Sequence, residues 1–212
     1  MTADPRVLLL HGIWNPRSWL MPLALRLRQQ GFKVDVFGYP SVFGGPDVAV
    51  PALADWLRRH GPTSLVGHSL GGLVALETLR QSPELDVGRV VCLGSPLCGS
   101  GTARTLADHG WGRALGRSGE LLLHGLPDWQ GRAEVGLVAG NLAHGVGALL
   151  NALPGDSDGT VGLDETCLHG LADHCVVPVS HTGMVFSAEV ASLTASFLRQ
   201  GHFPEDVPRY RR

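Results

Sequence analysis

The chain has 212 residues, and its 44% hydrophobic fraction is enough to build the core of one domain, while its 17% charged fraction argues against a disordered chain. The formal net charge of −2 gives no sign of the basic surface that binding to nucleic acid or to an anionic membrane would require. We therefore expect a single domain over residues 1–212.

No segment of the sequence predicts export or membrane insertion. Residues 1–6 are polar, residues 7–10 are too short for the apolar part of a signal peptide, and no run reaches the ~20 apolar residues of a membrane span. We expect a cytoplasmic protein with reduced cysteines, although Cys167 and Cys175 can pair in an oxidising setting.

Short apolar runs of strand length alternate with amphipathic segments along the chain. The predicted strands are Val7–Leu10, Lys33–Phe37, Thr63–Gly67, Arg89–Leu93, Glu134–Ala139 and Cys175–Val179. The predicted helices are Ser18–Gln30, Asp47–His60, Leu70–Gln81 and a last helix with the spacing Phe186, Val190, Leu193 and Phe197. This alternation predicts an α/β fold, with a parallel sheet and helices on both faces.

Several segments carry more local expectations. Ser18 is expected to cap its helix, with Pro22 tolerated because it lies in the first turn. Residues 97–130 are weakly periodic and rich in glycine, which predicts a partly helical, cap-like excursion within the domain that covers one rim of the sheet. The alternative is an ordinary surface crossover. The tail Pro208–Arg212 is expected to fray.

Polar residues follow the carboxyl ends of several predicted strands. In a parallel sheet these ends lie on one rim, and sites form there. The residues that follow them are His11-Gly12-Ile13, Ser69, Ser95-Pro96 and His181. We therefore expect the chemistry of the protein to lie on this rim.

The stretch Gly67-His68-Ser69-Leu70-Gly71 fits G-x-S-x-G and lies between a predicted strand and a predicted helix. Glycine flanks Ser69 on both sides because a sharp turn brings those positions too close for side chains. Gly72 then lets the helix pack tightly on the sheet. The pattern favours a catalytic serine over a purely structural turn.

A serine hydroxyl needs an adjacent base, normally a histidine oriented by a carboxylate. In hydrolases with this motif the chain order is serine, acid, histidine. The histidines that fit this order are His169, His174, His181 and His202. Among them, His181 alone follows the carboxyl end of the last predicted strand and precedes a helix, so we predict His181 as the base.

The acid is expected between the fifth and the last strand. Asp158 is preferred because the turn at Gly159 can direct it toward the rim, with Asp156 as the alternative and Asp164 and Glu165 further on. The acidic cluster also suggests Ca²⁺, but it lacks the spacing of an EF-hand. We expect neither a metal nor a cofactor.

An oxyanion hole needs backbone amides that face the oxygen of the tetrahedral intermediate. One is expected from Leu70, the residue after the nucleophile. The second is expected from the loop after the first strand, where Gly12 permits the turn and the Ile13 amide is the favoured donor. His11 is expected to be structural.

Four segments in this order resemble the α/β-hydrolase superfamily: Leu10-His11-Gly12-Ile13, Gly67-His68-Ser69-Leu70-Gly71-Gly72, Asp158-Gly159-Thr160-Val161 and Ser180-His181-Thr182-Gly183. Within it, the chain is most similar to small bacterial lipase- and esterase-like proteins. The resemblance implies a minimal, six-stranded form of the fold, the triad Ser69, Asp158 and His181, and the oxyanion donors Ile13 and Leu70. The acid departs from the pattern because it follows the fifth strand at a distance.

We therefore predict a serine hydrolase that cleaves small carboxylic esters with short or medium acyl chains through an acyl-enzyme. Six side chains are candidates for an apolar acyl pocket, with core packing as the alternative for each aromatic: Trp14, Trp19, Tyr39, Phe43, Leu97 and Trp129. An acyltransferase or a thioesterase would use the same triad. A binding protein without catalysis on the same scaffold is a further alternative, and the oligomeric state is left open.

Overall fold

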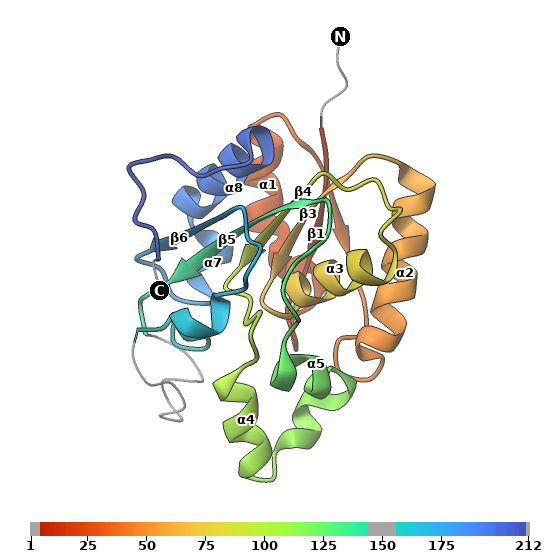
Figure 1. Ribbon diagram of the computed structural model, residues 1–212, viewed down its shortest axis with the longest axis vertical. Coiled ribbons are helices and arrows are strands. Elements are labelled where there is room, and N and C mark those ends of the chain that lie inside the picture. The colour runs from red at the N-terminus through yellow and green to blue at the C-terminus, as the bar shows by residue number, and fades with distance from the viewer. Residues whose placement is uncertain (1–4, 144–155, 211–212) are drawn as a thin grey trace.

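The computed structural model describes residues 5–143 and 156–210. Its described strands form one six-stranded, fully parallel sheet in the order β2-β1-β3-β4-β5-β6 (Figure 1). Their bounds are β1 (Arg6–Leu10), β2 (Lys33–Phe37), β3 (Ser64–His68), β4 (Arg89–Leu93), β5 (Glu134–Gly140) and β6 (Asp173–Val177). The predicted parallel α/β sheet is confirmed.

Helices cover both faces of this sheet. The α-helices are α1 (Met21–Gln29), α2 (Gly45–His60), α3 (Leu70–Gln81), α4 (Gly101–Asp108), α5 (Gly119–His124), α7 (Gly183–Phe186) and α8 (Ala188–Gln200). Three 3₁₀ segments are η1 (Arg17–Leu20), η2 (Gly112–Ser118) and η3 (Leu163–Thr166). No helix among the described residues is both long enough and apolar enough to cross a membrane.

Alternate residues of β1 build two separate cores. Val7 and Leu9 pack with α1 and α8 on one face, while Leu8 and Leu10 pack with α2 and α3 on the other. All four side chains are at most 1% exposed. Because both faces are covered, the strand reads as a continuous apolar run instead of an alternating one. Each such side chain contributes about 1.5–3 kcal/mol when it is buried.

Two expectations about the first helix and the last strand were wrong. Ser18 does not cap a helix, because it lies inside η1, and α1 begins after Leu20 without a side-chain cap. Pro22 does lie in the first turn of α1. The last strand ends at Val177, so Pro178 lies just past it, where its missing N–H costs no ladder bond.

The expected spacing of the last helix also fails at one position. Phe186 lies in α7 and is 46% exposed, so it does not belong to the buried face of α8. Instead, α8 begins after Ser187, whose hydroxyl accepts a hydrogen bond from the Val190 amide (3.2 Å). This cap sets the start of the helix because it satisfies an amide of the first turn.

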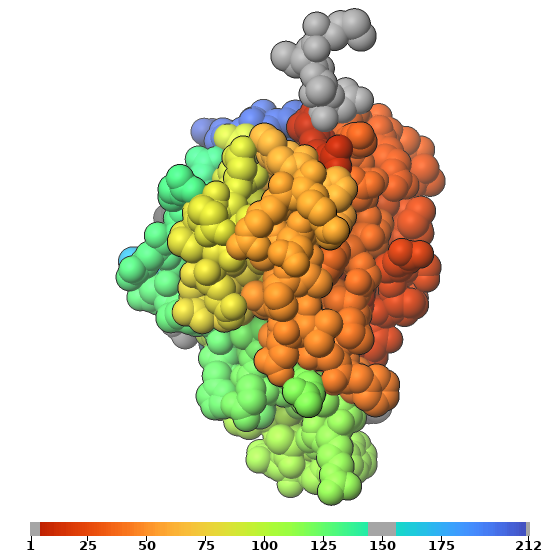
Figure 2. Space-filling view, turned by 90° about the vertical axis from the view of Figure 1, so that its right-hand side faces the viewer, coloured from red at the N-terminus to blue at the C-terminus, as the bar shows by residue number. Residues whose placement is uncertain are grey.

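Residues 97–130, the excursion, fold as α4, η2 and α5 joined by short turns. Figure 1 shows α4 at the bottom of the view with α5 above it, and Figure 2 shows the green α4–η2 region projecting beneath α2. The partly helical content is as expected.

The four cysteines include two that the sequence left open for pairing. Cys175 is fully buried in the core and is a free thiol, so no disulfide joins it to Cys167. The Cys167 Sγ lies 3.5 Å from the Leu163 carbonyl oxygen and 4.0 Å from Nδ1 of His174.

The C-terminal segment does not fray as the sequence suggested. The Val176 amide donates to the Pro208 carbonyl (2.9 Å), and Arg209 pairs with Cys175 as an antiparallel bridge. The Arg209 guanidinium holds both Asp173 carboxylate oxygens, at 2.7 and 3.1 Å. The segment is ordered because the edge strand β6 offers it unpaired backbone groups; residues 211–212 lie outside the described residues.

We expect Arg209→Ala to lower the free energy of unfolding by about 2 kcal/mol, because hydrogen bonds to charged groups contribute roughly 1.5–3 kcal/mol each and Asp173 loses its partner. Urea unfolding at pH 7 measures this change. Lys33→Ala removes an exposed cation from the opposite edge strand, β2, and serves as the control. Equal stability of the two variants would contradict a structural role for the Arg209 contact.

Candidate active site

Ser69 lies on a sharp turn between β3 and α3. Its φ of 55° and ψ of −122° are unusual for a residue with a side chain. Among the described residues, Trp14 is the other non-glycine residue with a left-handed φ (62°). Such conformations cost about 1–3 kcal/mol each and persist when their surroundings hold them. For Ser69, one such restraint is its amide, which donates to the Leu93 carbonyl (2.9 Å).

Backbone crowding explains the glycines around Ser69. A Cβ at position 67 would lie 2.3 Å from the Gly72 nitrogen, and one at position 71 would lie 2.3 Å from the Leu10 carbonyl oxygen. A Cβ at position 72 would lie 2.2 Å from Oγ of Ser95. A side chain at any of these positions would push α3 away from the sheet.

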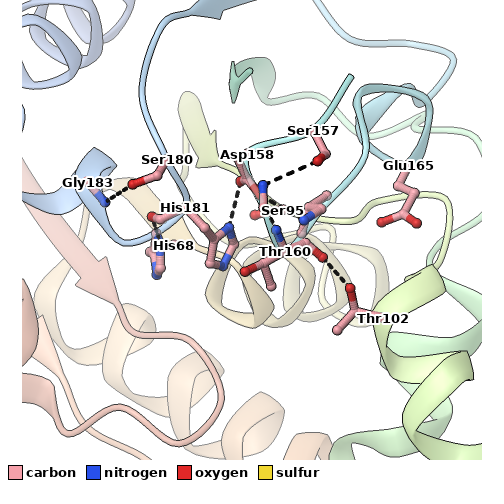
Figure 3. A network of polar contacts seen from close by, with 12 residues as sticks. His68, Ser95, Thr102, Ser157, Asp158, Thr160, Glu165, Ser180, His181 and Gly183 are labelled. Carbon is pink, nitrogen blue, oxygen red and sulfur yellow. Dashed lines mark hydrogen bonds and ion pairs between the residues drawn. The ribbon is translucent and has the colours of Figure 1, made fainter. Parts of the chain in front are cut away.

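Asp158 and His181 form a buried pair (Figure 3). The Asp158 Oδ2 lies 2.7 Å from the His181 Nδ1, and Asp158 is only 1% exposed. The second carboxylate oxygen accepts the amides of Thr160 (2.9 Å) and Val161 (2.7 Å), and the His181 amide donates to the Asp158 carbonyl (2.9 Å). The carboxylate is therefore held in one orientation and accepts three N–H groups.

The pair and Ser69 meet at the carboxyl end of β4. The Ser69 amide binds the carbonyl of Leu93, the last residue of that strand. The next residue is Gly94, where a Cβ would lie 2.9 Å from Asp158 Oδ2 and 3.1 Å from His181 Nδ1. The turn after β4 therefore contacts Ser69 through Leu93 and lies against the Asp158–His181 pair at Gly94.

The other candidate acids lie in different surroundings. The Asp156 side chain is exposed, and Asp164 accepts the Tyr210 hydroxyl. The Glu165 carboxylate accepts the amides of Gly101 (2.7 Å) and Gly162 (3.2 Å), so it joins the acid-bearing segment to the start of α4. Burial raises the pKa of Glu165 above its ordinary value.

The other candidate histidines have different partners. The His169 side chain is 87% exposed and faces Asp128. His174 lies within β6 and not before it, and burial lowers its pKa to about 4. The His202 Nδ1 is 3.1 Å from the Phe203 carbonyl oxygen in the segment after α8. The structure pairs only His181 among the four with a buried carboxylate.

His68 is a member of the site that the sequence reasoning missed. Its ring centroid lies 4.7 Å from that of His181, and its Nε2 donates to the His181 carbonyl (3.0 Å). Burial, with the nearby His181 as the next cause, lowers the pKa of His68 to about 3. The G-x-S-x-G pattern does not single out His68, because the second position of the pattern accepts many residue types.

The loop after β1 packs directly against Ser69. A Cβ at position 12 would lie 3.1 Å from the Ser69 Cβ. His11 has the expected structural role: its Nδ1 donates to the Gly12 carbonyl (2.8 Å) and its Nε2 accepts the Tyr39 amide (3.3 Å). The Tyr39 hydroxyl donates to the His11 carbonyl (2.6 Å), and the two rings stack.

Two backbone amides lie next to this contact. Leu70 is the first residue of α3, so its amide belongs to the first turn, where N–H groups have no intrahelical acceptor. Within the described residues, the Ile13 amide donates to no protein acceptor. The Asn15 side-chain amide contacts both sides of this loop. In the orientation that fits its hydrogen-bond partners, its NH₂ group donates to the Ile13 carbonyl (2.7 Å) and its oxygen accepts from the Trp19 indole N–H (3.0 Å).

The six predicted pocket residues do not gather in one place. Trp14 and Trp19 lie in and just after the loop that follows β1, and Trp19 contacts the Phe186 ring edge-on. Tyr39 and Leu97 are buried in the core, and Phe43 is 88% exposed. Trp129 lines a groove of about 490 Å³ against the C-terminal half of α3. Apolar composition alone did not separate core, pocket and surface.

No protein-family model and no curated protein sequence gives a significant match to this chain. Solved structures do match. The lipase BlEst2 of Bacillus licheniformis in its mature form is 19% identical over 95% of this chain and 93% of its own, with a TM-score of 0.74.

Two further structures cover 93% of this chain. A pyrethroid hydrolase from Sphingobium faniae is 15% identical over 98% of its own length, with a TM-score of 0.60. An extracellular α/β-hydrolase from a Paenibacillus species is 15% identical over 99% of its length, with a TM-score of 0.56. The chain therefore has the α/β-hydrolase fold.

We expect acid to destabilise the protein in part through His68. The unfolded chain binds a proton as the pH falls below 6.5, whereas the folded protein, with a pKa of about 3, does not. Stability from this group is therefore fully present above pH 6.5 and is lost toward pH 3, with a slope of about 1.4 kcal/mol per pH unit.

His68→Gln removes this titration and keeps an N–H donor for the His181 carbonyl. We expect its free energy of unfolding to fall less steeply than that of the wild type between pH 6.5 and 4.5, as measured by urea unfolding. His169→Gln, at an exposed position, is the matched control. An unchanged slope in His68→Gln would contradict the assignment of a neutral, buried His68.

Proposed function

We propose that the protein is a serine hydrolase that cleaves carboxylic esters. The observation that carries the proposal is the buried Asp158–His181 pair, joined at 2.7 Å beside a serine in a strained turn. A buried carboxylate that orients a histidine near a serine is the arrangement that activates a hydroxyl for acyl transfer. The fold, whose solved relatives include a lipase and other hydrolases, agrees with it.

In the proposed reaction, the Ser69 Oγ attacks the ester carbonyl carbon while Nε2 of His181 accepts its proton. Asp158 holds the Nδ1–H of the imidazole and stabilises the imidazolium that forms. The tetrahedral intermediate collapses, the C–O bond to the alcohol breaks, and His181 returns the proton to the leaving alcohol. Water then attacks the acyl-enzyme with the same proton shuttle and releases the acid.

The Ile13 and Leu70 amides are the proposed oxyanion donors. Leu70 opens the twelve-residue helix α3, so the positive end of the helix dipole adds to its N–H. The contact between Gly12 and Ser69 brings the Ile13 segment to the same side. Backbone donors of this kind need no reorganisation as the negative charge develops on the oxygen.

Short or medium acyl chains are the proposed substrates. Trp14 is half exposed on the loop after β1, and Trp19 lies nearby against Phe186, so apolar surface is available next to the proposed oxyanion donor. We keep Trp14 and Trp19 as the proposed acyl contacts. A panel of p-nitrophenyl esters from acetate to decanoate tests this length range.

We expect Ser69→Ala to abolish ester hydrolysis, with a loss on the order of 10⁶ in kcat, because no other group can form the acyl-enzyme. Fluorophosphonate labelling followed by mass spectrometry of the wild type should place the label on Ser69. Ser95→Ala is the matched control, since Ser95 is also buried and lies after β4. Labelling that persists in Ser69→Ala would exclude Ser69 as the nucleophile.

We expect Asp158→Asn to lower kcat by roughly 10⁴, because an amide in place of the carboxylate favours the wrong imidazole tautomer. Asp156→Asn, two residues away and exposed, should stay within twofold of the wild type. Both variants are assayed at one pH, with folding checked by circular dichroism. A crippled Asp156→Asn beside a normal Asp158→Asn would reverse the assignment of the acid.

A further inference from the structure

Trp14 combines an unfavourable backbone conformation with a contact to a remote part of the chain. Its φ of 62° lies in the left-handed region, which disfavours a residue with a bulky side chain. Its indole Nε1 donates to the Ala114 carbonyl in η2, at 2.8 Å. The two residues are one hundred positions apart, so this bond ties the loop after β1 to the excursion.

The excursion side of this bond is anchored independently. The Arg117 amide donates to the Val42 carbonyl (2.9 Å), and the Ser118 hydroxyl donates to the Ser41 carbonyl (2.5 Å). Gly116 has a φ of 55°, and a Cβ there would lie 2.1 Å from the Val42 oxygen. The backbone of η2 therefore sits directly on residues 41–42, which holds the Ala114 carbonyl in place.

The loop side of the bond leads directly to the proposed oxyanion donor. Ile13 precedes Trp14, and its carbonyl, which belongs to the peptide that joins the two residues, is held by Asn15 at 2.7 Å. On the other side of Ile13, Gly12 touches Ser69. Rotation of Trp14 out of its strained conformation would turn this peptide and move the Ile13 amide relative to Ser69.

We propose that Trp14 is a positioning residue: its indole N–H, held by the excursion, keeps the oxyanion loop in the geometry that aims the Ile13 amide at the reacting oxygen. The inference rests on the proposed esterase function and deepens it. It assigns the excursion a structural part in catalysis. This role belongs to the indole N–H and is additional to the proposed acyl contact, which the ring supplies. A residue that acted through its ring alone would affect only how well particular acyl chains bind.

Trp14→Phe tests this role because it keeps an aromatic ring and removes the N–H. We expect kcat to fall about tenfold or more, since loss of one oxyanion donor outright costs roughly 10²–10³. The loss should be equal for p-nitrophenyl acetate and hexanoate, with KM within twofold. The affinity for a trifluoromethyl ketone, whose adduct carries the oxyanion, should weaken by the same factor.

The matched control is Trp111→Phe, which changes an exposed tryptophan of the same excursion and should leave kcat unchanged. A second variant, Gly116→Ala, acts on the same bond from the other side, because its Cβ forces η2 away from Val42. It should lower kcat without touching the site. The double variant Trp14→Phe/Gly116→Ala should lose no more than the worse single variant, because both break one link.

The outcomes separate this inference from the proposed function. If wild-type protein neither hydrolyses esters nor takes a fluorophosphonate label, the proposed function fails and the inference fails with it. If the wild type is active and Trp14→Phe keeps full kcat, or loses activity only through KM on longer chains, the positioning role alone is overturned. If Trp14→Phe does not fold, Gly116→Ala decides: unchanged kcat in that folded variant overturns the role.

Discussion

The close approach of α3 to β1 is the constraint on which the rest of the site depends. At Gly71 the helix comes so near the Leu10 carbonyl that a Cβ would lie 2.3 Å from it. This contact holds the first turn of α3 against the strand end, which forces the chain through the strained conformation at Ser69. It also sets the loop after β1 against the serine, as the 3.1 Å at Gly12 shows. A side chain at either glycine would move α3 or the loop after β1 away from Ser69, so the packing at Gly12 and Gly71 determines the geometry of the candidate site.

A second requirement follows from placing a carboxylate in this packed rim. Asp158 is almost fully buried, and a buried charge is tolerated only with partners for its oxygens. The amides of Thr160 and Val161, in the same turn, donate to one carboxylate oxygen, and His181 donates to the other. His68 donates a hydrogen bond to the His181 carbonyl, and its own burial keeps the His68 ring neutral.

Much of this could be read from the sequence, for identifiable reasons. The apolar runs gave five of the six strands to within one residue at each end, because strands covered on both faces have little freedom in composition. The turn at Ser69 was predicted from the G-x-S-x-G pattern, His181 from its place after the last strand, and Asp158 from the turn at Gly159; the structure joins the last two by a hydrogen bond. The sequence-based predictions failed for residues whose positions are determined by tertiary contacts. Arg209 is ordered by an unpaired edge strand, His68 by a neighbour 113 residues away, and Tyr39 by the backbone of His11. None of these partners leaves a local pattern in the chain.

The same long-range contacts determine how the excursion behaves. At one end its helix α4 is joined to the acid-bearing segment, where Glu165 accepts the Gly101 amide and the Thr102 hydroxyl donates to the Thr160 carbonyl (2.6 Å). Thr160 in turn donates its amide to Asp158 (Figure 3). Moving α4 away would leave the Glu165 carboxylate, whose pKa burial already raises, without one of its amides. At η2 the excursion is joined to the loop after β1 through Trp14. A segment bonded to both loops restrains Asp158 and the loop after β1 together, so its displacement would disturb both sides of the candidate site at once.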